Sequence, residues 1–232
     1  MQNKTHRLLT GTLLVATPVL FMAAFTMLQI NFEYPDILRQ PAATVMEKFV
    51  AGGGGLVANW YLMMVAASLF VPISVLLHPY LAREDTPFMP IATVLGVTAG
   101  IVQMLGFVRW PFMVPGLAST YVNPATSEAT RAAIEVTFNA FNMYAGQGIG
   151  EHLGYMFTAL WTILIAMAMQ KSNIFSAWQG WLGIVLAVGI LLGNLEPAGV
   201  PFVGAINAIA YSLWALWLVV VGVALIKNGD KK

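Results

Sequence analysis

Charged side chains are scarce in this chain, and their scarcity narrows the class of protein. Only 9% of the 232 residues are charged and 59% are hydrophobic, whereas soluble domains carry about 25% charged residues. So few charges cannot cover a water-facing surface, but they can cap helices whose sides face lipid. The net charge of +1 provides no electrostatic basis for binding nucleic acid. We therefore expect the lipid bilayer as a partner, and no nucleic acid.

Cysteine is absent altogether. Its absence excludes disulfides, thiolate metal ligands, cysteine nucleophiles and cysteine-bound iron–sulfur clusters. The Gly-x-Ser-x-Gly pattern of a serine nucleophile is also missing. The sequence therefore leaves the cofactor unknown, and it leaves open whether the protein is an enzyme.

Six apolar stretches are each long enough to cross, or nearly cross, the bilayer as a helix, which takes roughly 20 residues. We predict an all-α, polytopic membrane protein in which a bundle of six transmembrane helices forms a single domain over residues 1–232. The expected spans are residues 8–30, 56–81, 90–108, 153–169, 177–195 and 205–226.

Lysine and arginine in the segments that flank the spans predict the orientation, because they concentrate on the cytoplasmic side. More of them fall on the side that holds both ends of the chain, so we expect both termini in the cytoplasm. That side collects Lys4, Arg7, Arg83, Lys171, Lys227, Lys231 and Lys232, whereas the other collects Arg39, Lys48, Arg109 and Arg131.

The first outer connection contains the pattern of an amphipathic helix. Pro41 suits the first position of a helix, and Glu47 and Lys48 lie off the apolar face. We predict a helix in the membrane interface, followed by a turn at the four glycines 52–55. The apolar face consists of Ala42, Val45, Met46 and Phe49.

The second outer connection predicts a helix that leads into a broken fourth span. Thr126 or Ser127 is a suitable cap for a helix that runs to about Tyr144. The three glycines of residues 146–150 then interrupt the helix, so the fourth span is expected to have an outer and an inner half. One stripe of the outer helix is polar and is most simply a water-facing side: Glu128, Arg131, Glu135, Asn139 and Asn142.

Ionisable side chains at membrane depth are costly, and they are candidates for a functional site. We predict that several of them meet in a polar pocket in the outer half of the bundle. The expected catalytic residues are Glu151, Glu196 and His152. The expected ligand-binding residues are Arg109, Trp110, Glu135, Asn139, Asn142, Tyr144, Gln147, Asn59 and Trp60.

Each candidate side chain has a chemical role and a plainer structural one. Arg109 is a permanent cation suited to a carboxylate or phosphate, but it could also pair with Glu151 or Glu196, or reach lipid headgroups. A buried glutamate is suited to general acid–base work. Glu151 and the adjacent His152 point about 100° apart on a helix, so they rarely bind one ion. We therefore predict no metal site.

Three blocks of sequence carry a resemblance to a known family. Residues 31–49 begin Asn-Phe-Glu-Tyr-Pro-Asp, residues 109–115 read Arg-Trp-Pro-Phe-Met-Val-Pro, and residues 144–155 begin Tyr-Ala-Gly-Gln-Gly-Ile-Gly-Glu. In this order they resemble a bacterial family of multi-pass membrane proteins catalogued as a domain of unknown function, over about residues 10–225. The resemblance implies a six-helix bundle in a bacterial inner membrane, and it implies no activity.

Two classes of function follow from these patterns. The first is a membrane-embedded enzyme or binding protein, which holds the head of an amphipathic, lipid-like small molecule at Arg109, with Glu151 as acid–base group and Glu196 as a second carboxylate. The alternative is a small-solute or proton-coupled transporter, to which a broken helix beside ionisable groups is suited. A non-catalytic membrane subunit is a third interpretation, and the sequence leaves a homo-oligomer open.

Overall fold

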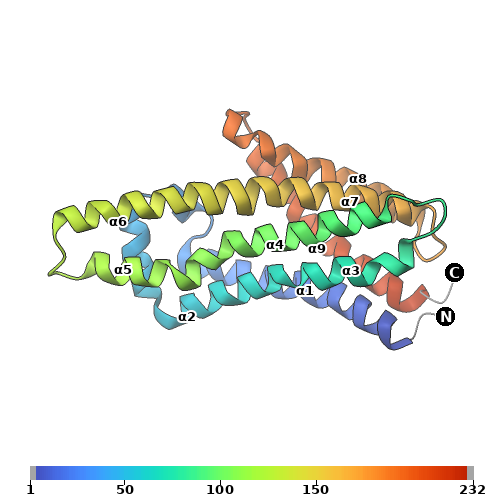
Figure 1. Ribbon diagram of the computed structural model, residues 1–232, viewed down its shortest axis with the longest axis horizontal. Coiled ribbons are helices and arrows are strands. Elements are labelled where there is room, and N and C mark those ends of the chain that lie inside the picture. The colour runs from blue at the N-terminus through green and yellow to red at the C-terminus, as the bar shows by residue number, and fades with distance from the viewer. Residues whose placement is uncertain (1–3, 229–232) are drawn as a thin grey trace. The chain divides into compact units, whose positions relative to one another are not determined.

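The computed structural model describes residues 4–228, and this part of the chain is helical, with no strand (Figure 1). The predicted all-α class is therefore confirmed. Lys231 and Lys232, used above to predict the orientation, lie outside the described residues. In chain order the elements are α1 (Lys4–Phe32), η1 (Asp36–Arg39), α2 (Ala42–Ser68), α3 (Phe70–Leu81), α4 (Met89–Phe112), α5 (Val114–Val122), α6 (Glu128–Phe141), η2 (Asn142–Leu153), α7 (Gly154–Gln170), α8 (Ala177–Leu192), η3 (Gly193–Ala198) and α9 (Val203–Asn228).

Six helical runs among these elements are long and apolar enough to cross a membrane. Each run contains one of the six apolar stretches identified in the sequence. The prediction of a protein with six helices of membrane-spanning length is therefore confirmed. The runs are Lys4–Phe32, Ala42–Leu81, Met89–Val122, Glu128–Gln170, Ala177–Ala198 and Val203–Asn228.

The predicted amphipathic helix is the first part of α2, and it ends at a kink. Gly53 has φ 55° and ψ −155°, a conformation that glycine adopts readily because it has no Cβ. The predicted turn within residues 52–55 is therefore found at Gly53. The four residues of the predicted apolar face are at most 5% exposed, and Phe49 contacts the rings of Phe32 and Trp110. This face of α2 thus packs on protein.

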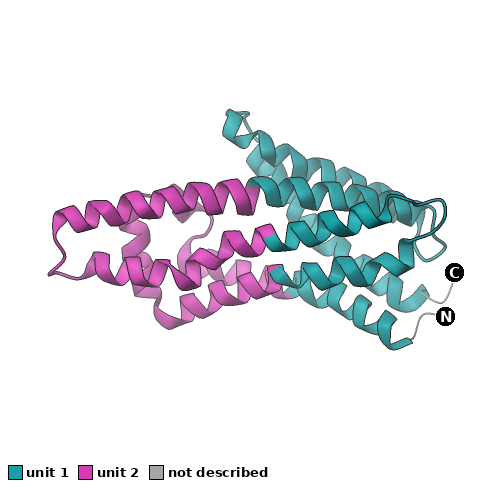
Figure 2. Cartoon of the chain, viewed as in Figure 1, with its two compact units in different colours: residues 1–19, 68–101, 152–232 teal, residues 20–67, 102–151 magenta. Residues whose placement is uncertain are grey.

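The chain divides into two compact units, which Figure 2 shows in different colours. Unit 1 comprises residues 1–19, 68–101 and 152–232, and unit 2 comprises residues 20–67 and 102–151. Each unit has a buried apolar cluster of its own. The two units are described separately below.

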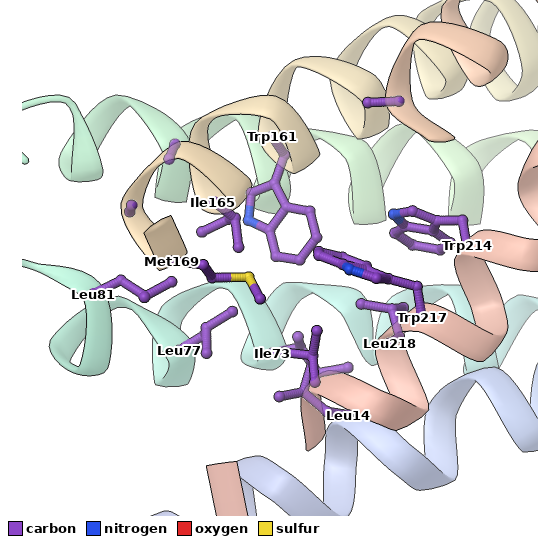
Figure 3. Packing of buried hydrophobic residues seen from close by; sticks show 14 of the residues in the cluster. Leu14, Ile73, Leu77, Leu81, Trp161, Ile165, Met169, Trp214, Trp217 and Leu218 are labelled. Carbon is purple, nitrogen blue, oxygen red and sulfur yellow. The ribbon is translucent and has the colours of Figure 1, made fainter. Parts of the chain in front are cut away.

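The core of unit 1 is built around buried tryptophans. Side chains of α1, α3, α7 and α9 meet there (Figure 3), and α8 lies beside both α7 and α9. Trp161 and Trp217 are at most 1% exposed, and the ring of Phe70 lies 4.7 Å from that of Trp161. Buried aromatic rings bring a large contact area to a helix interface.

Several polar groups in the core of unit 1 are hydrogen-bonded within the protein, although the buried Nε1 of Trp161 has no hydrogen-bond partner among the described residues. Trp214 Nε1 donates to Thr162 Oγ1 at 2.8 Å, and Asn207 Nδ2 donates to the carbonyl of Ile190 at 2.7 Å. The hydroxyl of Ser74 donates to the carbonyl of Phe70, one turn earlier in the same helix. These bonds satisfy groups that would otherwise be costly away from water.

The fourth helical run is capped by Ser127, whose hydroxyl accepts a hydrogen bond from the backbone N–H of Thr130 at 3.2 Å. Of the two predicted caps, Ser127 is therefore the correct one. The prediction that the glycines break the fourth span is wrong, because residues 142–153 form η2, which is π-helical, inside the continuous run Glu128–Gln170. In a π-helix each N–H bonds to the carbonyl five residues earlier, so the helix continues through η2 with a wider turn.

Candidate functional site

Arg109, near the end of α4, is the one charged residue among the buried residues of the part of the chain that the structure describes, and it is 7% exposed. Its Nη2 donates to Asn142 Oδ1, the first residue of η2, at 2.9 Å. Its Nη1 donates to the carbonyl of Gly106 in the same helix. The guanidinium carbon also lies 5.2 Å from the ring centroid of Trp110, within the range of a cation–π interaction. A buried charge requires partners of this kind.

Glycines let α4 and η2 approach closely enough for these contacts. A Cβ on Gly146 would lie 2.5 Å from Arg109 Nη2, and a Cβ on Gly106 would lie 2.6 Å from the Cα of Gly150. Close approach of this kind is typical of small residues at helix interfaces in membranes. Two of the glycines that mark the predicted interruption therefore make room for Arg109 and for α4.

Gly146→Ala is expected to lower the free energy of unfolding by about 1–3 kcal/mol. The guanidinium of Arg109 must move to admit the methyl group, and the charge-assisted bond to Asn142 is lost when it does. Gly148→Ala is the control, because a Cβ at that exposed position meets nothing closer than 3.5 Å. Thermal unfolding in detergent, followed by tryptophan fluorescence, measures both. Equal effects of the two substitutions would contradict this account of Gly146.

The π-helical geometry of η2 brings Glu151 to the same face as Asn142 and Gly146. With roughly 4.4 residues per turn, positions spaced four and then five apart lie nearly in line. In an α-helix, at about 100° per residue, Glu151 would lie about 180° away from Asn142. The negative charge of Glu151 contributes to the electrostatic environment of Arg109 and of Tyr34. The direct pairing of Arg109 with Glu151 stays a prediction.

Tyr34 belongs to this group of residues, although sequence reasoning did not select it for the site. It follows α1 in the loop before η1, and its ring lies 5.1 Å from that of Trp60. Burial raises the pKa of Tyr34, the nearby carboxylate of Glu151 raises it further, and Arg109 opposes both effects. The available signal was its position in the block at residues 31–49 that carries the family resemblance.

The raised pKa of Tyr34 predicts a phenol that stays neutral in the folded protein up to strongly alkaline pH. An unfolded tyrosine ionises near pH 10, so the contribution of Tyr34 to stability is fully present below pH 10 and is lost as the pH rises towards the higher folded value. Alkaline absorbance titration of the protein and of Tyr34→Phe should therefore give superimposable curves up to about pH 11. The prediction would be contradicted if the absorbance change of Tyr34→Phe in that range were smaller than that of the wild type by the share of one of the seven tyrosines.

Aromatic rings form the apolar surroundings of Arg109 in unit 2. The rings of Trp60 and Trp110 are stacked, with centroids 4.4 Å apart and an angle of 6° between the planes. Phe32 contacts both, at 6.1 and 5.5 Å, and the predicted site residue Asn59 donates to the carbonyl of Ala24 at 3.2 Å. The two tryptophans are fully buried, so they belong to the core of unit 2 and not to a lipid-facing belt.

Three buried polar atoms of unit 2 have no hydrogen-bond partner among residues 4–228. They are Arg109 Nε, Asn59 Oδ1 and Trp60 Nε1. Unsatisfied buried polar atoms are rare in native proteins, and each requires an explanation. All three belong to residues that the sequence predicts to bind a ligand.

The remaining predicted binding residues lie on the outside of unit 2 or serve its packing. Glu135 accepts a hydrogen bond from the hydroxyl of Tyr121 at 2.7 Å, which joins α6 to α5. Tyr144 is 72% exposed, and Asn139 and Gln147 are exposed as well. The predicted polar stripe of α6 is therefore divided between α5, the Arg109 group and the surface.

His152 and Glu196 belong to unit 1, and both are exposed. A shallow cavity of about 120 Å³ also belongs to unit 1. It includes none of the predicted site residues and is lined by Pro79, Tyr80, Ala82, Arg83, Ser172, Asn173 and Ile174. Within residues 4–228 no three histidine, aspartate or glutamate side chains are grouped as metal ligands. The predicted polar pocket remains a prediction.

Six apolar helical runs and a buried arginine define a helical protein of the multi-pass membrane class. The chain belongs to the DUF4386 family, described as a domain of unknown function, whose model matches residues 9–222. The resemblance identified in the sequence is therefore confirmed. No curated protein and no solved structure matches the chain.

Proposed function

We propose that this protein is a membrane-embedded enzyme or binding protein for an anionic amphipathic molecule, whose charged head is held at Arg109. One observation carries the proposal. The guanidinium is buried, and its Nε has no partner among the described residues, although Nη1 and Nη2 are both bonded. A buried cation with a free donor is suited to the oxygen of a carboxylate or phosphate.

The surroundings of Arg109 suit the rest of such a molecule. Trp60, Trp110 and Phe32 offer apolar surface beside the cation. Ligand sites are typically apolar with a few placed polar groups. A lipid-like molecule would thus place its head at the guanidinium and its tail among the rings.

Glu151 is the proposed acid–base group, because its charge already acts on Arg109 and Tyr34. A carboxylate beside a bound ligand can accept or return a proton. Tyr34, which stays protonated, would offer a hydroxyl as hydrogen-bond donor. Glu196 and His152, the other two predicted catalytic residues, remain predictions as a second carboxylate and a proton shuttle.

A small-solute or proton-coupled transporter is the second candidate, and the π-helical geometry of η2 beside Arg109 favours it. Transport also requires polar groups along the whole path. The buried hydroxyls of Ser74 and Thr162 bond instead to backbone carbonyls of their own helices. Proton flux in vesicles carrying the protein, absent from vesicles with an Arg109→Gln variant, would favour transport.

We further propose a bacterial inner-membrane location with both termini in the cytoplasm. The distribution of lysine and arginine supports this orientation. The absence of cysteine makes it easy to test, because a single introduced cysteine is the only thiol. Ser172→Cys should be labelled from the cytoplasmic side only and Asn123→Cys from the outer side only. The reverse result would invert the orientation.

Native mass spectrometry of protein extracted in mild detergent tests the proposed ligand site. The wild type should retain a small anionic molecule that Arg109→Gln loses. Arg109→Lys keeps the charge and should retain part of the binding. Arg39→Gln is the matched control, since Arg39 is an exposed arginine in the same unit, paired with Asp36 at 3.2 Å.

Thermal unfolding of each variant shows which ones remain folded. A folded Arg109→Gln variant that binds the same molecule as the wild type would overturn the proposal. Loss of the molecule in Arg39→Gln as well would show that binding depends on surface charge and not on the buried site.

A further inference from the structure

The length of η2 sets it apart from ordinary π-helical geometry. π-Helices are rare and usually last a single turn, whereas η2 extends over 12 residues, Asn142–Leu153. The wider turn packs the backbone less well than an α-helix does. Contacts with neighbouring residues must therefore stabilise the π geometry over these 12 residues.

The contacts on one face of η2 supply such a stabilisation. Asn142 accepts the bond from Arg109, Gly146 lies against the guanidinium, and the charge of Glu151 acts on Arg109. These three positions share a face only in the π geometry. In an α-helix Glu151 would turn to the opposite side from Asn142. The attraction between Arg109 and Glu151 is therefore available to the π form and not to the α form.

Glycine makes up a quarter of η2 and weakens its intrinsic preference for the α form. Its three glycines, at 146, 148 and 150, each weaken the preference for a fixed helix by about 1 kcal/mol relative to alanine. Proteins often carry π-helical turns at functional sites.

We propose that η2 is a register switch, held in the π form by the attraction between Arg109 and Glu151. An anionic group that binds Arg109 competes with Glu151 for the guanidinium. η2 then relaxes towards the α form and turns the Glu151 carboxylate away from Arg109. This regulation by a ligand rests on the proposed function above, whereas the dependence of η2 on the two charges does not.

Disulfide formation between introduced cysteines measures the register directly. Met143 and Gly148 are both exposed and are five residues apart, which makes them neighbours in the π form. In an α-helix the Cα atoms of such a pair are about 8.6 Å apart, beyond the limit of about 7 Å for a disulfide. The Met143→Cys/Gly148→Cys pair should therefore cross-link in the π form only.

The matched control is the Met143→Cys/Gln147→Cys pair, whose four-residue spacing makes its members neighbours in both forms. Copper phenanthroline oxidises both pairs in detergent-extracted protein that is otherwise free of cysteine. Adding Glu151→Gln should slow cross-linking of the five-residue pair at least about tenfold, a shift of roughly 1.4 kcal/mol in the register equilibrium, and leave the four-residue pair unchanged. Arg109→Lys, which keeps the charge, should retain most of the cross-linking.

Oleate, an amphipathic carboxylate, tests control by a ligand. Oleate should slow cross-linking of the five-residue pair when residue 151 is glutamate. It should have no further effect in protein that also carries Glu151→Gln. Equal cross-linking with and without Glu151→Gln, in protein shown to be folded by thermal unfolding, would overturn the register switch. A response to Glu151→Gln without a response to oleate would uphold the switch and overturn its control by such an anion.

Discussion

Trp110→Ala is expected to lower the free energy of unfolding by about 3–5 kcal/mol. The indole is fully buried, stacks on Trp60 at 4.4 Å, and contacts Phe32, Phe49 and Phe138. Its removal leaves a cavity that these rings cannot close, and it takes away the ring beside Arg109. Thermal or denaturant unfolding, followed by circular dichroism, measures the loss.

Trp181→Ala is the matched control for Trp110→Ala. Trp181 lies on α8 and is 63% exposed, so its removal creates no cavity and should change the free energy of unfolding by less than about 0.5 kcal/mol. Similar losses for the two variants would show that Trp110 does not organise the core of unit 2.

Arg109→Ala is expected to cost a similar amount, about 3–5 kcal/mol, through a different mechanism. The substitution removes the donors that bond Asn142 and Gly106, and it removes a positive charge whose electrostatic environment includes Glu151. Most of the loss in the free energy of unfolding is therefore expected to depend on the presence of Glu151.

A double-mutant cycle separates that part of the cost. Arg109→Gln and Glu151→Gln are measured singly and together by thermal unfolding. The double variant should be more stable than the sum of the single losses predicts, by about 1–3 kcal/mol, because it contains neither charge. Additive losses would mean that the two side chains do not interact in the folded protein.

Much of the fold follows from local patterns in the sequence. Each apolar stretch of roughly 20 residues satisfies its backbone as a helix wherever it lies in a membrane, so the six runs could be predicted without knowing their neighbours. Ser127 and Gly53 mark a helix start and a kink through the chemistry of single residues. The length of the fourth run, Glu128–Gln170, was harder to predict, because the glycines that suggested a break are accommodated in η2.

The candidate site was only partly predictable. The free-energy cost of a charge at membrane depth selected Arg109 and Glu151, and π-helical geometry places Glu151 on the face of η2 that contacts Arg109. The same reasoning selected Glu196 and His152, which are exposed in unit 1. It did not select Tyr34, because a tyrosine in a loop carries no charge at neutral pH. The free-energy cost of a charge at membrane depth therefore does not apply to it.

Composition and periodicity are local properties, and they were sufficient for the class of the protein, its six apolar helices and the choice of Arg109 as a residue that needs an explanation. The partners of Arg109 required the tertiary structure. Asn142 and Glu151 share a face only because η2 is π-helical, and η2 lies in close contact with α4, an element about 30 residues or more away along the sequence. A helical pattern read at 3.6 residues per turn places Glu151 on the opposite side from Asn142.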